Sequence, residues 1–179
     1  MLKSKIKICG IRDIDTLDCC IQNKVDFFGL IFYTKSSRNI ELENALNLIK
    51  HSKNIPISSV GVFFNEKIDE IKNLLRQIDL NYIQLHGEED FNYIKELKKN
   101  FSIKIIKNIP ISNKEDFLKT KDFNNADMFL FDYKPKKNEL PGGNAKKFSW
   151  ELLKDIKLDK PWFISGGINI DNIKIINEY

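Results

Sequence analysis

Several common patterns are missing from this 179-residue sequence, and each absence argues against a class of protein. The three cysteines form no CxxC pair and are odd in number, which disfavours a disulfide framework or a structural zinc site. No apolar run approaches the roughly 20 residues that a membrane-spanning helix needs, and no signal peptide is recognisable. No dense basic cluster is interleaved with aromatic residues. We therefore expect a cytoplasmic protein that binds neither membranes nor nucleic acid and holds no metal.

The residues that are present favour one folded domain over residues 1–179. Hydrophobic residues make up 42% and charged residues 30% of the chain, and the composition is even along its length. This is enough to build a core and keep the surface polar. The formal net charge of +4 is mild and suits a small anionic substrate. The sequence does not decide between a monomer and a homodimer.

Short apolar runs alternate with helical patterns along the whole chain. The runs predict seven parallel strands buried on both faces, at residues 5–9, 27–33, 59–64, 82–86, 103–106, 128–132 and 162–165. They recur about every 26 residues, a spacing typical of the (β/α)8 TIM barrel. A doubly wound open sheet fits the pattern nearly as well. About seven repeats are present, so we expect a C-terminally incomplete barrel that lacks its eighth strand and helix.

Apolar residues at helical spacing predict helices between these strands. The clear ones cover residues 14–21, 42–49, 68–78 and 91–97. Two weaker ones lie around Phe117 and at 152–156, and the last helix begins near Asp171. Asp13, Asn65 and Asn169 are the expected N-caps.

Two residues at predicted strand ends are candidates for proton transfer, because barrel enzymes carry their working residues there. Cys9 ends the first strand; it is either a general base, favoured by nearby positive charge, or a small buried hydrophobic residue. Asp132 ends the sixth strand. It either caps the following turn or acts as an acid from a dry site. Cys19 and Cys20 lie within a helical pattern and are expected to pack.

Further candidates follow other strands. Arg38 is a carboxylate or phosphate ligand or a plain surface residue, and His86 is a substrate contact or a structural histidine. We expect Glu88 and Glu89 in the first turn of a helix. The glycine pairs Gly142–Gly143 and Gly166–Gly167 let backbone amides approach a ligand, and the second pair stands where barrels bind phosphate.

Together these motifs resemble the phosphoribosylanthranilate isomerase family, over nearly the whole chain and in the family's order. The matching segments are KICG at residues 7–10, GLIFYTKSSR at 29–38, VGVFFN at 60–65, QLHGEE at 84–89, FLFD at 129–132, PGGNAKKFSW at 141–150 and ISGGINIDNI at 164–173. The resemblance implies an Amadori rearrangement in the anthranilate branch of tryptophan biosynthesis, on a small phosphorylated substrate and without a cofactor. The product would be 1-(2-carboxyphenylamino)-1-deoxyribulose 5-phosphate.

The resemblance also assigns roles to matching residues. Asp132 would be the general acid and Cys9 the general base. Arg38 would meet the anthranilate carboxylate, while His86 and Gly142–Gly143 would line the site. Gly166–Gly167 would hold the phosphate.

The sequence departs from the family's pattern in three places. The usual GGTG or GGSG is replaced at Gly143–Asn144–Ala145, Ser149 stands where Asp is usual, and the eighth strand with its phosphate loop is not seen. Two alternatives therefore stay open. One is an inactive or complemented barrel fragment that binds a phosphorylated ligand or a partner chain. The other is a different phosphate-binding barrel such as a ribulose-phosphate epimerase, which would ask for more His and Asp residues at strand ends.

Overall fold

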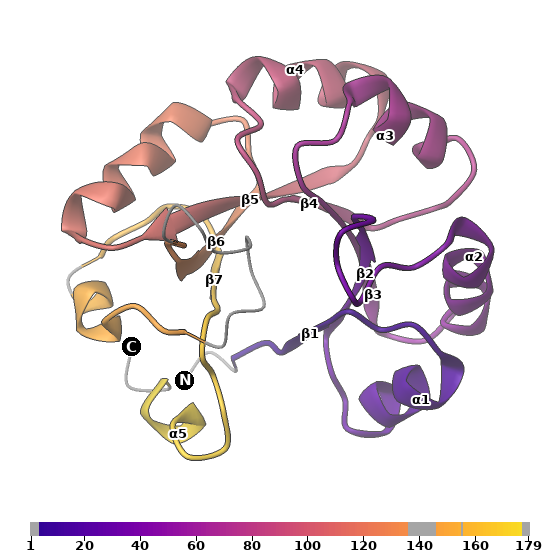
Figure 1. The fold of residues 1–179 in the computed structure, drawn as a ribbon, viewed down its shortest axis with the longest axis horizontal. Coiled ribbons are helices and arrows are strands. Elements are labelled where there is room, and N and C mark those ends of the chain that lie inside the picture. The colour runs from indigo at the N-terminus through magenta and orange to yellow at the C-terminus, as the bar shows by residue number, and fades with distance from the viewer. Residues whose placement is uncertain (1–3, 136–145, 155, 177–179) are drawn as a thin grey trace. The chain divides into compact units, whose positions relative to one another are not determined.

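The computed structural model describes residues 4–135, 146–154 and 156–176. The chain divides into two compact units, Met1–Ile105 and Ile106–Tyr179. Each unit consists of short parallel strands that alternate with helices (Figure 1). The expectation of one domain over the whole chain stays a prediction.

The first unit contains four β/α repeats. Its strands are β1 (Lys7–Cys9), β2 (Phe27–Phe32), β3 (Ser58–Phe63) and β4 (Tyr82–Leu85), and its helices are α1 (Ile14–Gln22), α2 (Leu42–His51), α3 (Ile68–Leu75) and α4 (Phe91–Asn100). These elements confirm the predicted strands and the four clear helices to within a few residues.

The four strands of this unit are parallel and follow one another in chain order. The register aligns Cys9 with Gly29, Gly29 with Val60 and Val60 with Tyr82, so these residues lie in one row on one face. Helices α1–α4 lie together on one side of the strands (Figure 1). A doubly wound sheet would carry helices on both faces and its first strand in the interior, so this arrangement argues against that alternative.

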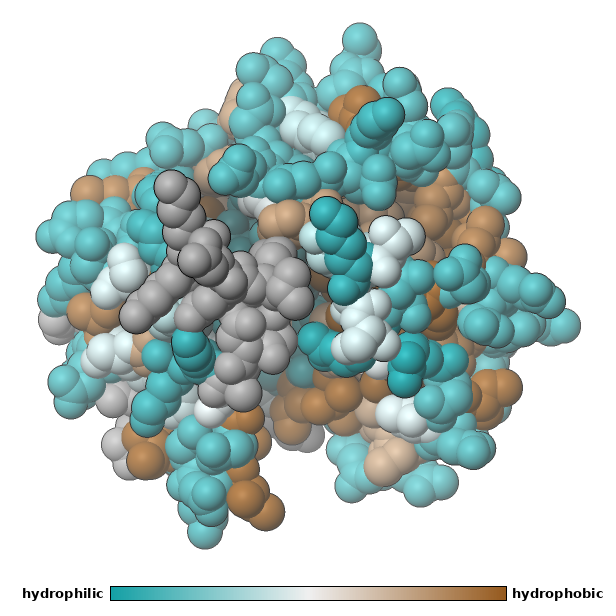
Figure 2. All heavy atoms as spheres, in the orientation of Figure 1, coloured by the Kyte–Doolittle hydropathy of each residue, from teal (hydrophilic) through white to brown (hydrophobic). Residues whose placement is uncertain are grey.

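The core of the first unit lies between the strands and the helices. Phe28 and Leu30 of β2 pack in one cluster with Leu17 of α1 and with Ala45 and Leu48 of α2, and all five are buried. Phe28 and Leu30 alternate along β2 with Gly29, so the row that contains Cys9 faces away from the helices. Hydrophilic side chains predominate on the visible surface around α3 and α4 (Figure 2).

Helix starts follow the predicted capping chemistry at some positions only. The Asp13 side chain accepts a hydrogen bond from Thr16 N at 2.8 Å, and Asp90 accepts one from Tyr93 N at 2.8 Å. The prediction that Asn65 caps α3 is wrong, because the N-cap residue is Lys67. Asn65 instead has a φ of 50° and its side-chain oxygen accepts the amide of Glu88.

The second unit contains β5 (Lys104–Ile111), which begins at the boundary, η1 (Lys114–Phe123), β6 (Met128–Tyr133), η2 (Trp150–Leu153), β7 (Trp162–Ile164) and α5 (Ile173–Ile176). Strand β6 pairs in parallel with both β5 and β7. Phe131 is fully buried, and its ring packs against Phe117 of η1 and Trp162 of β7. The two weaker predicted helices appear as the 3-10 helices η1 and η2. Asn169 caps the turn before α5, since its side chain accepts the amides of Asp171 and Asn172.

Strand β5 extends five residues beyond the predicted end at residue 106. The prediction stopped there because Lys107 and Asn108 interrupt the apolar run, yet both are buried. The Lys107 ammonium lies 5.4 Å from the centroid of the Phe123 ring, a cation–π contact that accounts for part of its burial.

A buried carboxylate holds the connection between β5 and η1. Asp116 is 5% exposed, and it accepts hydrogen bonds from the amide and hydroxyl of Ser112 and from the ammonium groups of Lys119 and Lys134. Asn113 completes a capping box with it. Burial raises the pKa of Asp116, but the bonds from Ser112, Lys119 and Lys134 outweigh burial and hold its pKa well below the usual value.

Asp116→Asn should therefore destabilise the chain in a pH-dependent way. A carboxyl whose pKa is lowered by folding stabilises the fold fully above its unfolded value of 3.8, and this contribution is lost progressively as the pH falls from that value toward the lower pKa of the folded state. We expect the variant to lose about 1–3 kcal/mol in urea unfolding at neutral pH, and the deficit to shrink steadily as the pH is lowered from about 4. Asp122→Asn, at an exposed position of the same 3-10 helix, is the control. A deficit of equal size at neutral pH and below about pH 4 would contradict this account.

Candidate active site

One group of candidate residues lies at the end of β1. Cys9 is half-buried, and its side chain occupies the row that faces away from the helices. A Cβ built on Gly29 would lie 2.8 Å from Cys9 Sγ and 3.2 Å from Lys7 Nζ, so the thiol and the ammonium both occupy the space over this glycine. The sequence analysis did not single out Lys7 or Gly29 as site residues. Lys7 could have been found from the strand alternation, because it lies two residues before Cys9 and so on the same face, whereas Gly29 requires the strand pairing to be known.

Arg38 reaches the same strand end from the loop after β2. Its Nη1 donates a hydrogen bond to the main-chain oxygen of Cys9 at 2.9 Å, across 29 residues of sequence. A second arginine, Arg12, makes a similar bond to Ser37 O at 2.9 Å. The structure thus brings two predicted site residues, Cys9 and Arg38, into direct contact.

His86 follows β4 on the face that also carries Gln84, which pairs with Val62 of β3. Gln84 is 2% exposed, and its side-chain nitrogen lies 3.0 Å from His86 Nδ1. The His86 amide donates to Phe63 O at 2.9 Å. This histidine is fixed both through its ring and through its backbone.

A buried carboxylate joins the loops that follow β3 and β4. Glu89 is 5% exposed and accepts the amides of Asn65 at 2.8 Å and Gly87 at 2.9 Å. The prediction that Glu88 and Glu89 lie in the first turn of a helix is wrong, because α4 begins at Phe91 with Asp90 as its cap. Glu89 instead holds the turn that carries His86.

A separate group of candidate residues, in the second unit, lies at the end of β6. Asp132 is half-buried, and its Oδ1 accepts the amide of Tyr133 at 2.7 Å. A Cβ built on Gly166 would lie 2.7 Å from the same Oδ1 and 2.8 Å from Lys146 O. Gly166 also has a φ of 87°, which disfavours any side chain. The turn after β7 therefore lies directly against the carboxyl group of Asp132.

The two predicted glycine pairs differ in what the structure describes. Gly166 and Gly167 both have positive φ, and their amides donate no backbone hydrogen bond within the described part of the chain. The described part of the following helix, α5, has four residues, too short for a helix dipole that would attract an anion strongly. Gly142 and Gly143 lie outside the described residues.

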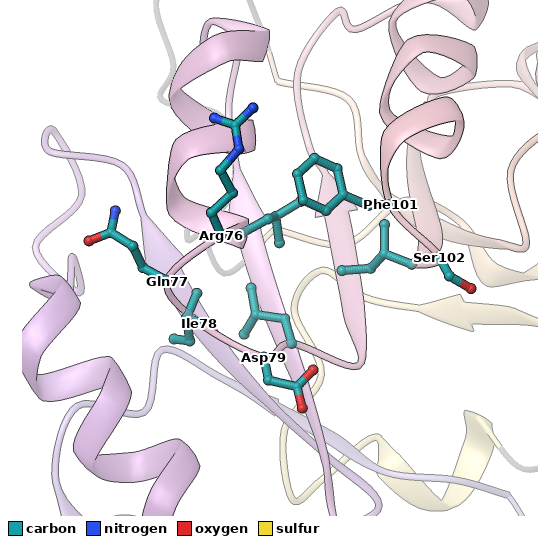
Figure 3. A pocket seen from close by; sticks show the side chains of 9 residues that line it. Arg76, Gln77, Ile78, Asp79, Phe101 and Ser102 are labelled. Atoms are coloured by element: carbon teal, nitrogen blue, oxygen red, sulfur yellow. The ribbon is translucent and has the colours of Figure 1, made fainter.

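Other features of the described residues do not form a competing site. They contain no group of three or more His, Cys, Asp or Glu side chains that is able to hold a metal ion, and no helix long and apolar enough to cross a membrane. A hollow of about 320 Å³ lies between the segments that precede β4 and β5. The charged ends of Arg76 and Asp79 point in opposite directions there, so they do not converge on a ligand (Figure 3).

Comparison with known proteins decides the family. The family model for N-(5'phosphoribosyl)anthranilate (PRA) isomerase matches residues 6–178. The chain belongs to this family. An N-(5'-phosphoribosyl)anthranilate isomerase of Thermoanaerobacter sp. is 40% identical over 98% of the chain and 84% of the relative, and one of Paramagnetospirillum magneticum is 32% identical over 94% and 79%. The resemblance drawn from the motifs is confirmed.

Solved PRA isomerases also share the fold. The enzyme of Thermotoga maritima has a TM-score of 0.83 at 27% identity, covering 98% of this chain and 83% of that one. Another PRA isomerase, solved with reduced 1-(o-carboxyphenylamino)-1-deoxyribulose 5-phosphate, has a TM-score of 0.80 at 26% identity and covers 98% and 82%. The predicted fold class, a (β/α)8 barrel of which this chain shows seven strands, is confirmed.

Glu89→Gln should weaken the loops that carry His86. The amide keeps one oxygen but turns an N–H₂ group toward a backbone donor, so one buried amide loses its acceptor. We expect the free energy of unfolding in urea to fall by about 1–3 kcal/mol, with faster hydrogen exchange at Asn65 and Gly87. The neighbouring Glu88→Gln, at an exposed position, should change stability by less than about 0.5 kcal/mol. Equal effects of the two substitutions would show that Glu89 does not hold these loops.

Proposed function

We propose that the chain catalyses the Amadori rearrangement of N-(5'-phosphoribosyl)anthranilate to 1-(2-carboxyphenylamino)-1-deoxyribulose 5-phosphate, with Cys9 as general base and Asp132 as general acid. The observation that carries the proposal is the position of these two residues. In a chain of the PRA isomerase family, each stands at the carboxyl end of a parallel strand, where β/α-barrel enzymes hold their catalytic groups.

The reaction is a proton transfer in two stages. Asp132 gives a proton to the ring oxygen of the ribose, and the ring opens to an iminium ion. Cys9, as thiolate, then removes the proton from C2′, and the resulting enolamine becomes the ketone. Neither stage needs a redox group, because the carbon skeleton is oxidised at one carbon and reduced at its neighbour. The proposed steps use no cofactor or metal.

The surroundings of the two groups suit these roles. Lys7 Nζ and the Arg38 guanidinium place two cations beside Cys9, the electropositive environment in which reactive cysteines occur. The amide of Tyr133 and the bare backbone of Gly166 orient the Asp132 carboxyl group. A fixed orientation favours transfer in one direction, since proton transfer requires hydrogen-bond distance and alignment.

The remaining residues bind the substrate in this proposal. Arg38 meets the anthranilate carboxylate, for which a planar guanidinium is well shaped. Gly166 and Gly167 offer amide N–H groups to the phosphate, and His86 lines the site together with Gly142 and Gly143. We also propose a cytoplasmic location, because Cys9, Cys19 and Cys20 are all free thiols, as is usual in a reducing compartment.

Cys9→Ala should reduce turnover of N-(5'-phosphoribosyl)anthranilate by about a hundred- to ten-thousand-fold, the usual contribution of a general base. Anthranilate-type fluorescence of the substrate gives the rate, and circular dichroism checks the fold. Cys19→Ser, which changes an exposed thiol in α1, should keep full turnover. Normal turnover of Cys9→Ala would disprove the mechanism.

Asp132→Asn should also reduce turnover by about a hundred- to ten-thousand-fold. The carboxamide keeps the oxygen that accepts the Tyr133 amide and nearly the same shape beside Gly166, but it is a very poor proton donor. Stability in urea should therefore change little. If the unsubstituted chain itself folds without turnover, the alternative of an inactive or complemented form that binds a phosphorylated ligand or a partner chain takes precedence.

A further inference from the structure

The hydrogen bond between Arg38 and the backbone of Cys9 forms within the protein itself. Arg38 lies in the loop after β2 and is exposed, yet its Nη1 donates to Cys9 O at 2.9 Å. A long flexible side chain loses considerable freedom when it is held in this way. Its guanidinium is therefore used inside the protein before any ligand arrives.

Gly10 provides the space for this contact. It has a φ of 89°, and a Cβ built on it would lie 2.7 Å from Arg38 Cδ and 3.0 Å from Arg38 Nη1. The side chain of Arg38 thus lies directly on the backbone that follows Cys9. The amides of Gly10 and Ile11 donate to Gly29 O at 2.8 and 3.0 Å, which fixes the same turn from the strand side.

The hydrogen bond from Arg38 Nη1 to Cys9 O leaves the edge of the guanidinium that carries Nε and Nη2 able to bind a ligand. Arg38 Nε and Nη2 make no hydrogen bond to another described residue. These two groups form a planar fork that matches the two oxygens of a carboxylate. One guanidinium is thus able to hold a carboxylate with one edge and the backbone of Cys9 with its remaining nitrogen.

We propose that Arg38 is a positioning residue for Cys9, which ties the placement of the base to the group that recognises the substrate carboxylate. This inference rests on the proposed function for the identity of the base. A carboxylate bound to the fork fixes the guanidinium, and the fixed guanidinium holds the carbonyl of Cys9. Carboxylate recognition then contributes to turnover as well as to binding.

Arg38→Lys separates positioning from recognition when it is assayed with a substrate that lacks the carboxylate, N-(5'-phosphoribosyl)aniline. Lysine keeps the charge but lacks the planar fork. A residue that only binds the carboxylate would leave kcat for this analogue unchanged. We expect kcat for the analogue to fall at least about tenfold, because small misplacements of a catalytic group lower the rate strongly.

Hydrogen exchange at the amides of Gly10 and Ile11 supplies a readout without any substrate. We expect exchange at both amides to become about tenfold faster in Arg38→Lys, because the turn loses a charge-assisted hydrogen bond. Arg76→Lys is the control, since Arg76 is also exposed and also donates a hydrogen bond through Nη1, to Asn73 Oδ1, away from this turn. It should change neither exchange at these amides nor kcat by more than about twofold.

The two measurements distinguish the ways in which the proposal fails. Unchanged exchange in Arg38→Lys would overturn the proposal whatever the turnover. Faster exchange with an unchanged kcat for the analogue would overturn it as well, because the contact would then be purely structural. Absence of turnover of N-(5'-phosphoribosyl)anthranilate by the unsubstituted chain would overturn the proposed function, while the exchange measurement would still decide whether Arg38 holds the turn.

Discussion

The arrangement of the candidate site depends on the parallel register of the strands. In the first unit the register places Cys9 beside Gly29 on the face opposite the helices. A slip of one residue would turn Cys9 toward the helix layer and move Phe28 and Leu30 out of the core. The apolar side chains that bury one face therefore also determine which polar side chains occupy the other. In this way core packing fixes the chemistry at the strand ends.

Charged side chains hold several of the loops after the strands. Glu89 accepts amides from two loops, Asp116 accepts the amide and hydroxyl of Ser112 and two lysine ammonium groups, and Arg38 donates to the backbone of Cys9. Backbone amides in loops need acceptors, and a carboxylate is able to accept several at once. Each of these side chains binds backbone atoms of a loop and so fixes the course of the main chain between the elements.

The sequence predicts the strands, the four main helices and the places of Cys9 and Asp132, because continuous apolar runs and helical spacing are local signals. It fails where a tertiary contact overrides the local pattern. Strand β5 was predicted too short because Lys107 is buried against an aromatic ring from a distant segment. The roles of Asn65 and Glu89 were missed because they serve each other's loops rather than a helix. Gly29 gives no local signal, because its role is to leave space for the side chains of Cys9 and Lys7 on the neighbouring strand.

In the proposed mechanism the two proton-transfer groups lie in different compact units, Cys9 in the first and Asp132 in the second. On that proposal, neither unit carries both steps of the reaction. Local opening of either unit would then remove turnover, whichever unit opens first. Residual activity during mild denaturation would then follow the unfolding of the less stable unit, whereas spectroscopic signals average over the unfolding of both units. If the proposed catalytic groups lie in different units, we expect activity to be lost at a lower denaturant concentration than most of the helical circular-dichroism signal.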